Sequence, residues 1–195
     1  MRRVPWWAVL SAACAPVFLI GGWTLAAARQ PGGFNPVTDT ISALAARGAA
    51  DRWVMTAGLA GLGGCHIATA LGLRPAALAG RVALAAGGVA TLLVAAFPQP
   101  ARGSSTAHVW AAATGFVTLA LWPAFAARYE RRWLWPRPVA GLATAILLLA
   151  IVIWFAVEFI GKGGLIGLSE RFAAGSQAFC PLAVVLLVRR HLAQS

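Results

Sequence analysis

Residues 139–159, VAGLATAILLLAIVIWFAVEF, form the most hydrophobic run of the sequence. An α-helix needs about 20 predominantly apolar residues to cross the hydrocarbon layer of a bilayer, so this run predicts a transmembrane helix. It nevertheless contains a carboxylate, Glu158, close to its end. A charged side chain facing lipid costs on the order of 3 kcal/mol at mid-membrane and less toward the end of the span. Glu158 is therefore expected to point inward or to reach the interface.

Five further apolar runs of similar length accompany this one. The 195 residues are 60% hydrophobic and 11% charged, with a mean hydropathy of +0.77. A soluble domain usually carries about a quarter charged residues, which excludes that class here. The sequence predicts an all-α integral membrane bundle of six transmembrane helices, forming one domain over residues 1–195. The six expected spans are residues 6–27, 52–73, 80–97, 107–127, 139–159 and 169–187.

The basic residues predict the orientation of this bundle. With six spans both termini lie on the same side, and that side collects ten basic residues against six on the other. The ten are Arg2, Arg3, Arg74, Arg81, Arg128, Arg131, Arg132, Arg137, Arg189 and Arg190. The positive-inside rule then places both termini in the cytoplasm. Because the bases are scattered over short loops, the net charge of +11 gives no reason to expect a nucleic-acid partner.

The first outer loop holds a polar stretch, FNPVTDTISALAARGAADR, at residues 34–52. Apolar Ile41 and Leu44 alternate there with polar side chains, a pattern that predicts a short amphipathic helix lying on something apolar. Asp39 stands close to the expected start of this helix, where the unpaired amides and the helix dipole favour a carboxylate. Capping and a functional role both stay open for Asp39. The stretch as a whole is interpreted as a lid over a possible cavity between the helices.

Polar side chains gather in the outer half of the bundle, where four of the five acids fall. Gln177 follows Glu170 by seven residues and shares its helix face, which predicts a polar seam in the last span. Alternatively, Glu170 is an acid in the first turn of its helix, where it only stabilises the helix dipole. The outer tryptophans are alternatively an aromatic belt at the membrane interface. His108 stands above a face of small residues that leaves room for a ligand or for a neighbouring helix. For His66, deeper in the second span, a structural hydrogen bond is favoured over a functional role.

The three cysteines, Cys14, Cys65 and Cys180, lie inside the expected spans. Their positions match no CxxC or Cys/His spacing, so they are interpreted as packing residues. No metal site and no cofactor is predicted.

One stretch carries a resemblance that extends over nearly the whole chain. The segment FNPVTDTISALAARGAADRWVM at residues 34–55 is followed by a glycine-rich second span that contains His66. Phe97-Pro98 then ends the third span, and His108 stands at the start of the fourth. This order of features resembles a family of six-helix bacterial membrane proteins catalogued only as a domain of unknown function. The DTIS segment is its most specific part. The resemblance implies a multi-pass protein of the bacterial cell membrane and supplies no activity.

In its chemical roles the chain is also similar to small membrane-embedded terpene cyclases that make meroterpenoids. In those enzymes a carboxylic acid protonates a prenyl alkene or epoxide, and aromatic rings shelter the carbocation. The similarity implies that either Asp39 or Glu158 is the acid and that the other is its partner. A carboxylic acid keeps its proton more readily in an apolar site, and aromatic faces attract cations. The substrate-binding residues expected around them are Phe34, Thr40, Ser42, Trp23, His108, Trp110, Trp154, Glu170, Arg171 and Gln177.

Two function classes follow from these observations. The first is a cyclase acting on a hydrophobic, isoprenoid-like molecule within membrane lipid, with initiation by protonation. No DDxxD-like acidic cluster is present to bind a magnesium diphosphate, which disfavours initiation by ionisation of a diphosphate. The alternative class is a non-catalytic membrane protein, such as a transporter subunit, a lipid-binding protein or an assembly factor.

Overall fold

The computed structural model describes residues 4–127 and 138–194, and these are helical nearly throughout. Six of the helices are long and apolar enough to cross a membrane, which confirms the predicted all-α bundle. A short helix lies between the first two, as expected. In chain order the helices are α1 (Trp6–Ala27), α2 (Ile41–Leu44), α3 (Trp53–Gly72), α4 (Leu78–Ala96), α5 (Thr106–Ala126), α6 (Pro138–Gly161) and α7 (Ile166–Gln194).

The observed spans follow the predicted ones closely except at α7. This helix starts at Ile166, before the predicted residue 169, and it continues past residue 187 through Arg189 and Arg190. The prediction ended where the apolar run ends, whereas a helix continues once it has left the apolar layer. Glu170 is consequently the fifth residue of α7 and not a first-turn acid. The basic loop at residues 128–137, which contributed to the predicted orientation, lies outside the described residues.

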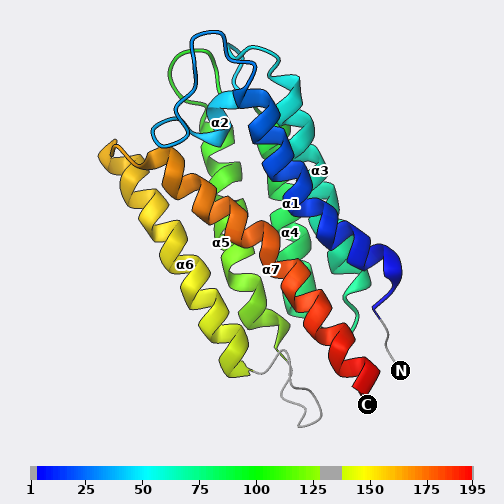
Figure 1. Cartoon of the computed structure of the whole chain (residues 1–195). Helices are drawn as coiled ribbons and strands as arrows, with labels where there is room; N and C mark the ends of the chain where they lie inside the picture. Colours follow the sequence, from blue (N-terminus) through cyan, green and yellow to red (C-terminus); the bar gives the residue numbers. More distant parts are fainter. Residues whose placement is uncertain (1–3, 128–137, 195) are drawn as a thin grey trace.

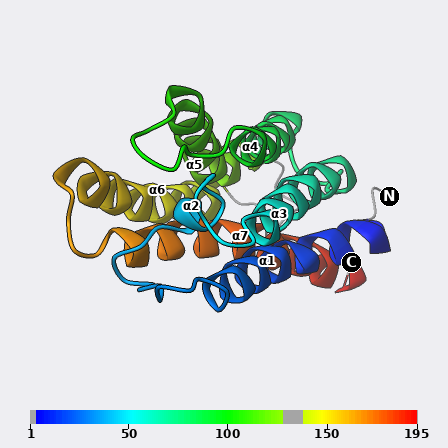
Figure 2. The same cartoon turned by 90° about the horizontal axis from the view of Figure 1, so that it is seen from above.

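The six long helices form a ring in chain order. Each packs against the next along the chain, and α7 closes the ring by packing on α1. α7 also crosses the bundle far enough to touch α3 and α5. The start of α1 and the end of α7 lie at one end of the bundle, and α2 lies at the opposite end (Figure 1). Viewed along the bundle, α2 covers the space that the long helices surround (Figure 2).

Glycines allow the helices of this ring to approach closely, as is common in membranes. The clearest case joins α3 to α4 through Gly63 and Gly88. A Cβ added at either residue would lie 2.7 Å from the carbonyl oxygen of the other. The backbones therefore touch at this point, and neither position has room for a larger residue.

Replacing Gly63 by alanine is expected to lower the free energy of unfolding by about 1–3 kcal/mol, because the added methyl group forces the two backbones apart. The adjacent Gly64 is a matched control, since a Cβ there meets nothing within 4 Å. Reversible unfolding of Gly63→Ala and Gly64→Ala in detergent measures the difference. Equal stabilities of the two variants would contradict the α3–α4 packing described above.

The short helix α2 is amphipathic, as predicted. Ile41 and Leu44 are 3% and 1% exposed and belong to a core cluster with Leu19 and Met55, whereas Ala43 is exposed. Thr40 caps the helix, because its hydroxyl accepts a hydrogen bond of 3.1 Å from the amide of Ala43. α2 thus plugs one end of the bundle with two buried side chains.

Candidate functional site

Three cavities adjoin α2. One is lined mainly by residues 30–50 of the first loop, Asp39 among them. The other two, which differ in size and surroundings, lie among the long helices. The smaller of these two, here called the central cavity, has a volume of about 60 Å³ and lies inside the ring between α1, α3, α4, α5 and α7. The other, here called the lateral cavity, has a volume of about 500 Å³ and lies between α5 and α6, beneath α2 and the loop at residues 99–103. The larger volume falls within the usual range of small-molecule sites.

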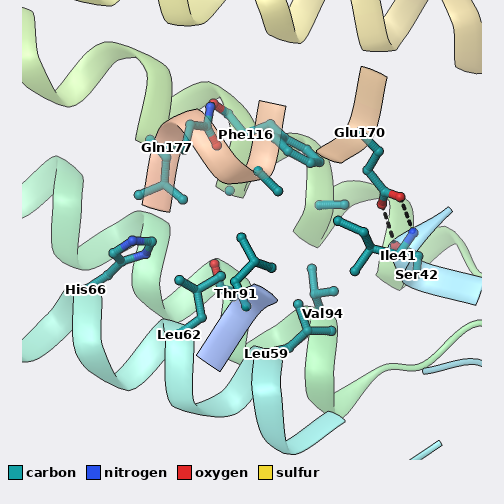
Figure 3. Close-up of a pocket in the computed structure, with 15 residues that line it drawn as sticks. Ile41, Ser42, Leu59, Leu62, His66, Thr91, Val94, Phe116, Glu170 and Gln177 are labelled. Carbon is teal, nitrogen blue, oxygen red and sulfur yellow. Dashed lines mark hydrogen bonds between the residues drawn. The ribbon is translucent and has the colours of Figure 1, made fainter. Parts of the chain in front are cut away.

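Glu170 lines both cavities and is only 4% exposed. One carboxylate oxygen, Oε2, accepts a hydrogen bond from the backbone amide of Ile41. The other, Oε1, accepts one of 3.1 Å from the hydroxyl of Ser42. Figure 3 shows both bonds, which tie α7 to α2 across the top of the bundle. A buried carboxyl group held in this way combines a structural role with access to two cavities.

Phenylalanines form much of the wall of the lateral cavity. The rings of Phe116 and Phe155 have centroids 5.2 Å apart, and Phe155 and Phe159 follow at 6.1 Å. Val117 and Phe159 also line this cavity, and they are 42% and 45% exposed. The cavity therefore reaches the surface of the bundle along two spans. Because α5 and α6 are both candidate membrane spans, we expect this opening to face lipid.

His108 contributes a polar atom to the same cavity. It is 2% exposed, and its Nδ1 lies 2.9 Å from the carbonyl oxygen of Phe97. A carbonyl oxygen only accepts hydrogen bonds, so Nδ1 carries the proton that is donated. In the neutral imidazole Nε2 is then an acceptor. The backbone is fixed nearby by Ser105, which caps α5 by accepting a hydrogen bond from the amide of His108.

Arg171 fastens the first loop to α7. Its Nη1 donates to the carbonyl oxygens of Pro36, Asp39 and Gly167 at 2.8–2.9 Å. Its guanidinium group also lies 5.3 Å from the ring centre of Phe34, and 5.7 Å from that of Trp23. These distances are within the range of cation–π attraction. The predicted residues Arg171, Phe34 and Trp23 therefore lie together, and Arg171 holds the first loop against α7. This set of contacts is called the Arg171 clamp below.

Asp39 and Glu158, the two predicted catalytic residues, lie in separate turns. The Asp39 carboxylate accepts from the amide of Asn35 at 2.8 Å, while Thr40 takes the capping role considered for Asp39. The Glu158 carboxylate accepts from the amide of Leu165 at 3.0 Å and closes the α6–α7 turn. Neither residue is among those lining the central or the lateral cavity. Their catalytic roles stay predictions.

The remaining predicted residues divide between the cavities and the surface. Thr40, Ser42, His108 and Glu170 line the lateral cavity, and Gln177 lines the central one. Trp110 is 70% exposed, about 200° around α5 from His108, and so faces away from that cavity. Trp154 packs on Phe172, with ring centres 5.8 Å apart. Within the described residues no group of three His, Cys, Asp or Glu side chains is placed to hold a metal ion.

Two features of the site were missed by the sequence reasoning. The first is the phenylalanine wall, although Phe155 and Phe159 stand four residues apart on one face of α6. The second is His66, for which the described residues supply no partner for the expected structural hydrogen bond. Its two ring nitrogens are buried and have no hydrogen-bond partner in the part of the chain that the structure describes.

The six long, apolar helices define a multi-pass membrane protein with six candidate membrane-spanning helices. The family described as "Protein of unknown function (DUF998)" matches residues 12–187, and the chain belongs to it. Membership confirms the resemblance to a six-helix family of unknown function. No curated protein and no solved structure matches the chain.

Proposed function

We propose that this protein binds an amphiphilic molecule of the membrane, with an isoprenoid-like chain, in the lateral cavity. The observation that carries the proposal is the buried Glu170 carboxyl group beside a cavity of about 500 Å³ with a phenylalanine wall. An apolar chain would lie along Phe116, Phe155 and Phe159, and a polar head group would reach Glu170. With both termini in the cytoplasm, as the basic residues predict, the cavity belongs to the outer leaflet.

The head group is restricted by the chemistry of the polar groups around it. The oxygens of Glu170 and the Nε2 of neutral His108 are hydrogen-bond acceptors. A ligand head that donates, such as a hydroxyl or an ammonium group, complements them. A phosphate head would bring negative charge next to a carboxylate in an environment of low dielectric constant, where repulsion is strong. The favoured ligands are therefore long-chain or prenyl alcohols and amines.

Binding of three probes with the same chain tests this proposal. Farnesol and farnesylamine are expected to raise the melting temperature of the purified protein, and farnesyl phosphate to raise it far less. Ligand at about 100 times its Kd stabilises a protein by about 2.7 kcal/mol, which a melting curve resolves. The variant Ala113→Phe, which fills the cavity, should lose the effect. Ala143→Phe on the exposed side of α6 is the matched control.

Either of two results would contradict the proposal. One is equal stabilisation by all three probes in Ala113→Phe and in the unaltered protein, which would indicate partition into the detergent belt. The other is a larger stabilisation by farnesyl phosphate than by farnesol or farnesylamine, which would mean that the Glu170 carboxyl group does not contact the head group of the ligand.

A second candidate is the protonation-initiated terpene cyclase. It is favoured by a carboxyl group and three phenylalanine rings bordering one cavity. In this scheme the Glu170 acid would transfer its proton to a prenyl alkene or epoxide, and the cyclised cation would lose a proton to a base. The product is an isomer of the substrate, so a product of unchanged mass formed from an epoxidised farnesyl phenol would support it. Asp39 and Glu158 remain alternative acids, and activity that survives Glu170→Gln would point to them.

A further inference from the structure

His66 lies in the interior of the bundle and lines the central cavity. Its side chain is 1% exposed, and both Nδ1 and Nε2 lack a partner among the described residues. A neutral imidazole has one N–H to donate and one nitrogen that accepts. Leaving such a group unpaired in a buried site costs about 1–3 kcal/mol. The ring therefore requires partners other than the side chains around it.

The cavity next to His66 offers acceptors and space for such partners. Thr91 donates its hydroxyl proton to the carbonyl of Gly87, which leaves its oxygen lone pairs available. Gln177 donates its Nε2 to the carbonyl of Phe116 at 2.8 Å, which leaves Oε1 as an acceptor. At roughly 15 Å³ for each water molecule, the volume of 60 Å³ accommodates about four.

Glu170 stands at the opposite end of this cavity. Figure 3 shows His66 and Gln177 together at one end, and Glu170 with Ile41 and Ser42 at the other. Gln177 follows Glu170 by seven residues in α7, which corresponds to about 10 Å along the helix axis. Four water molecules in a row, separated by about 2.8 Å, cover that distance.

We propose that the central cavity holds a short chain of ordered water molecules that hydrogen-bonds His66 and leads to Glu170, so that the two side chains exchange protons. In one direction the carboxylic acid of Glu170 gives its proton to the first water. Each water passes on one proton as it receives another, and the last protonates a ring nitrogen of His66. The acid becomes a carboxylate, the imidazole becomes an imidazolium, and the waters are unchanged.

The charged groups around this pair are few among the described residues, and the nearest is Arg171, which interacts electrostatically with Glu170. Among the described residues that line the cavity, His66 and Glu170 are the two that ionise. Arg171 stands next to Glu170 in the chain but donates to carbonyl oxygens of the first loop and of Gly167. Glu170 and Ser42 also line the lateral cavity, so they connect the interior with the opening toward lipid. The relay requires no amphiphile in the lateral cavity and stands or fails separately from ligand binding.

Nuclear magnetic resonance of protein labelled with ¹⁵N-histidine in phosphatidylcholine nanodiscs tests the relay. The His66 signal is assigned by its loss in His66→Gln. Cross-peaks from water to the His66 ring are expected, together with exchange of its N–H proton with bulk water. Glu170→Gln keeps an acceptor for Ile41 but removes the transferable proton, and it should slow this exchange about tenfold or more. Asp51→Asn, an exposed acid at the same end, should leave the rate unchanged.

A second variant keeps the test decisive if Glu170→Gln does not fold. Ala174, one turn after Glu170, lines the central cavity, and Ala174→Val adds bulk there while Glu170 is retained. It should slow the exchange of the His66 proton as well. The absence of water cross-peaks at His66, cross-peaks to carbon-bound protons of a ligand in their place, or an unchanged exchange rate in either folded variant would overturn the proposal.

Discussion

Replacing Glu170 by alanine is expected to lower the free energy of unfolding by about 3 kcal/mol. The substitution leaves the buried amide of Ile41 and the partly buried hydroxyl of Ser42 without their acceptor. Glu170→Gln retains one carbonyl oxygen of nearly the same position, and it should cost about 1 kcal/mol. Unfolding of the three proteins in detergent, followed by tryptophan fluorescence, provides the comparison.

Glu158→Ala is the matched control for this prediction. Glu158 is also a carboxylate that accepts from a backbone amide at the α2 end of the bundle, but it is only partly buried. Its removal should cost less than about 1 kcal/mol, because water can replace the lost bond. If Glu158→Ala and Glu170→Ala were equally destabilised, the central role given to Glu170 in tying α2 to α7 would be wrong.

Replacing Arg171 by leucine is expected to release the first loop from α7. The change removes three hydrogen bonds to loop and helix carbonyls and two cation–π contacts. Hydrogen exchange of the backbone amides at residues 37–41 should accelerate about 100-fold, which corresponds to about 2.7 kcal/mol of lost protection. Mass spectrometry of peptides covering the loop measures this acceleration, while peptides from α3 and α4 should not change.

Arg29→Leu serves as the comparison, because Arg29 is an arginine at the same end of the bundle. Its pairing with Asp51 is 3.8 Å long, and the two side chains are 44% and 52% exposed. Exposed pairs of this kind contribute less than about 1 kcal/mol. If exchange in the loop is no faster in Arg171→Leu than in Arg29→Leu, Arg171 does not hold the loop against α7, and the Arg171 clamp is refuted.

The six spans and α2 were predictable because hydrophobic length and periodicity are properties of single segments. Residues 139–159 are apolar enough to require a bilayer, whatever they pack against. The alternation around Ile41 and Leu44 likewise reports a buried face before the partner is known. The end of α7 was not predictable in this way, since its last turns are polar and no longer need the membrane.

The candidate site was predictable only in part, because it depends on which helices become neighbours. Glu170 and Gln177 were recognised as a polar seam from their spacing. Asp39 and Glu158 stood out as acids in or beside apolar sequence, yet each accepts a hydrogen bond from a nearby amide of its own turn. The phenylalanine wall arises from Phe116 on α5 and Phe155 on α6, a pairing that no single segment reveals.

The central claim is that the cavity between α5 and α6 receives the chain of an amphiphile whose head reaches Glu170. Labelling with a photoreactive farnesol carrying a diazirine at the end of its chain, in nanodiscs, tests this most directly. We expect the label on residues of the lateral cavity in α5 and α6, around Phe116 and Phe155, with loss of labelling in Ala113→Phe. Labels spread over the lipid-facing surfaces of all the spans, unchanged by Ala113→Phe, would contradict it.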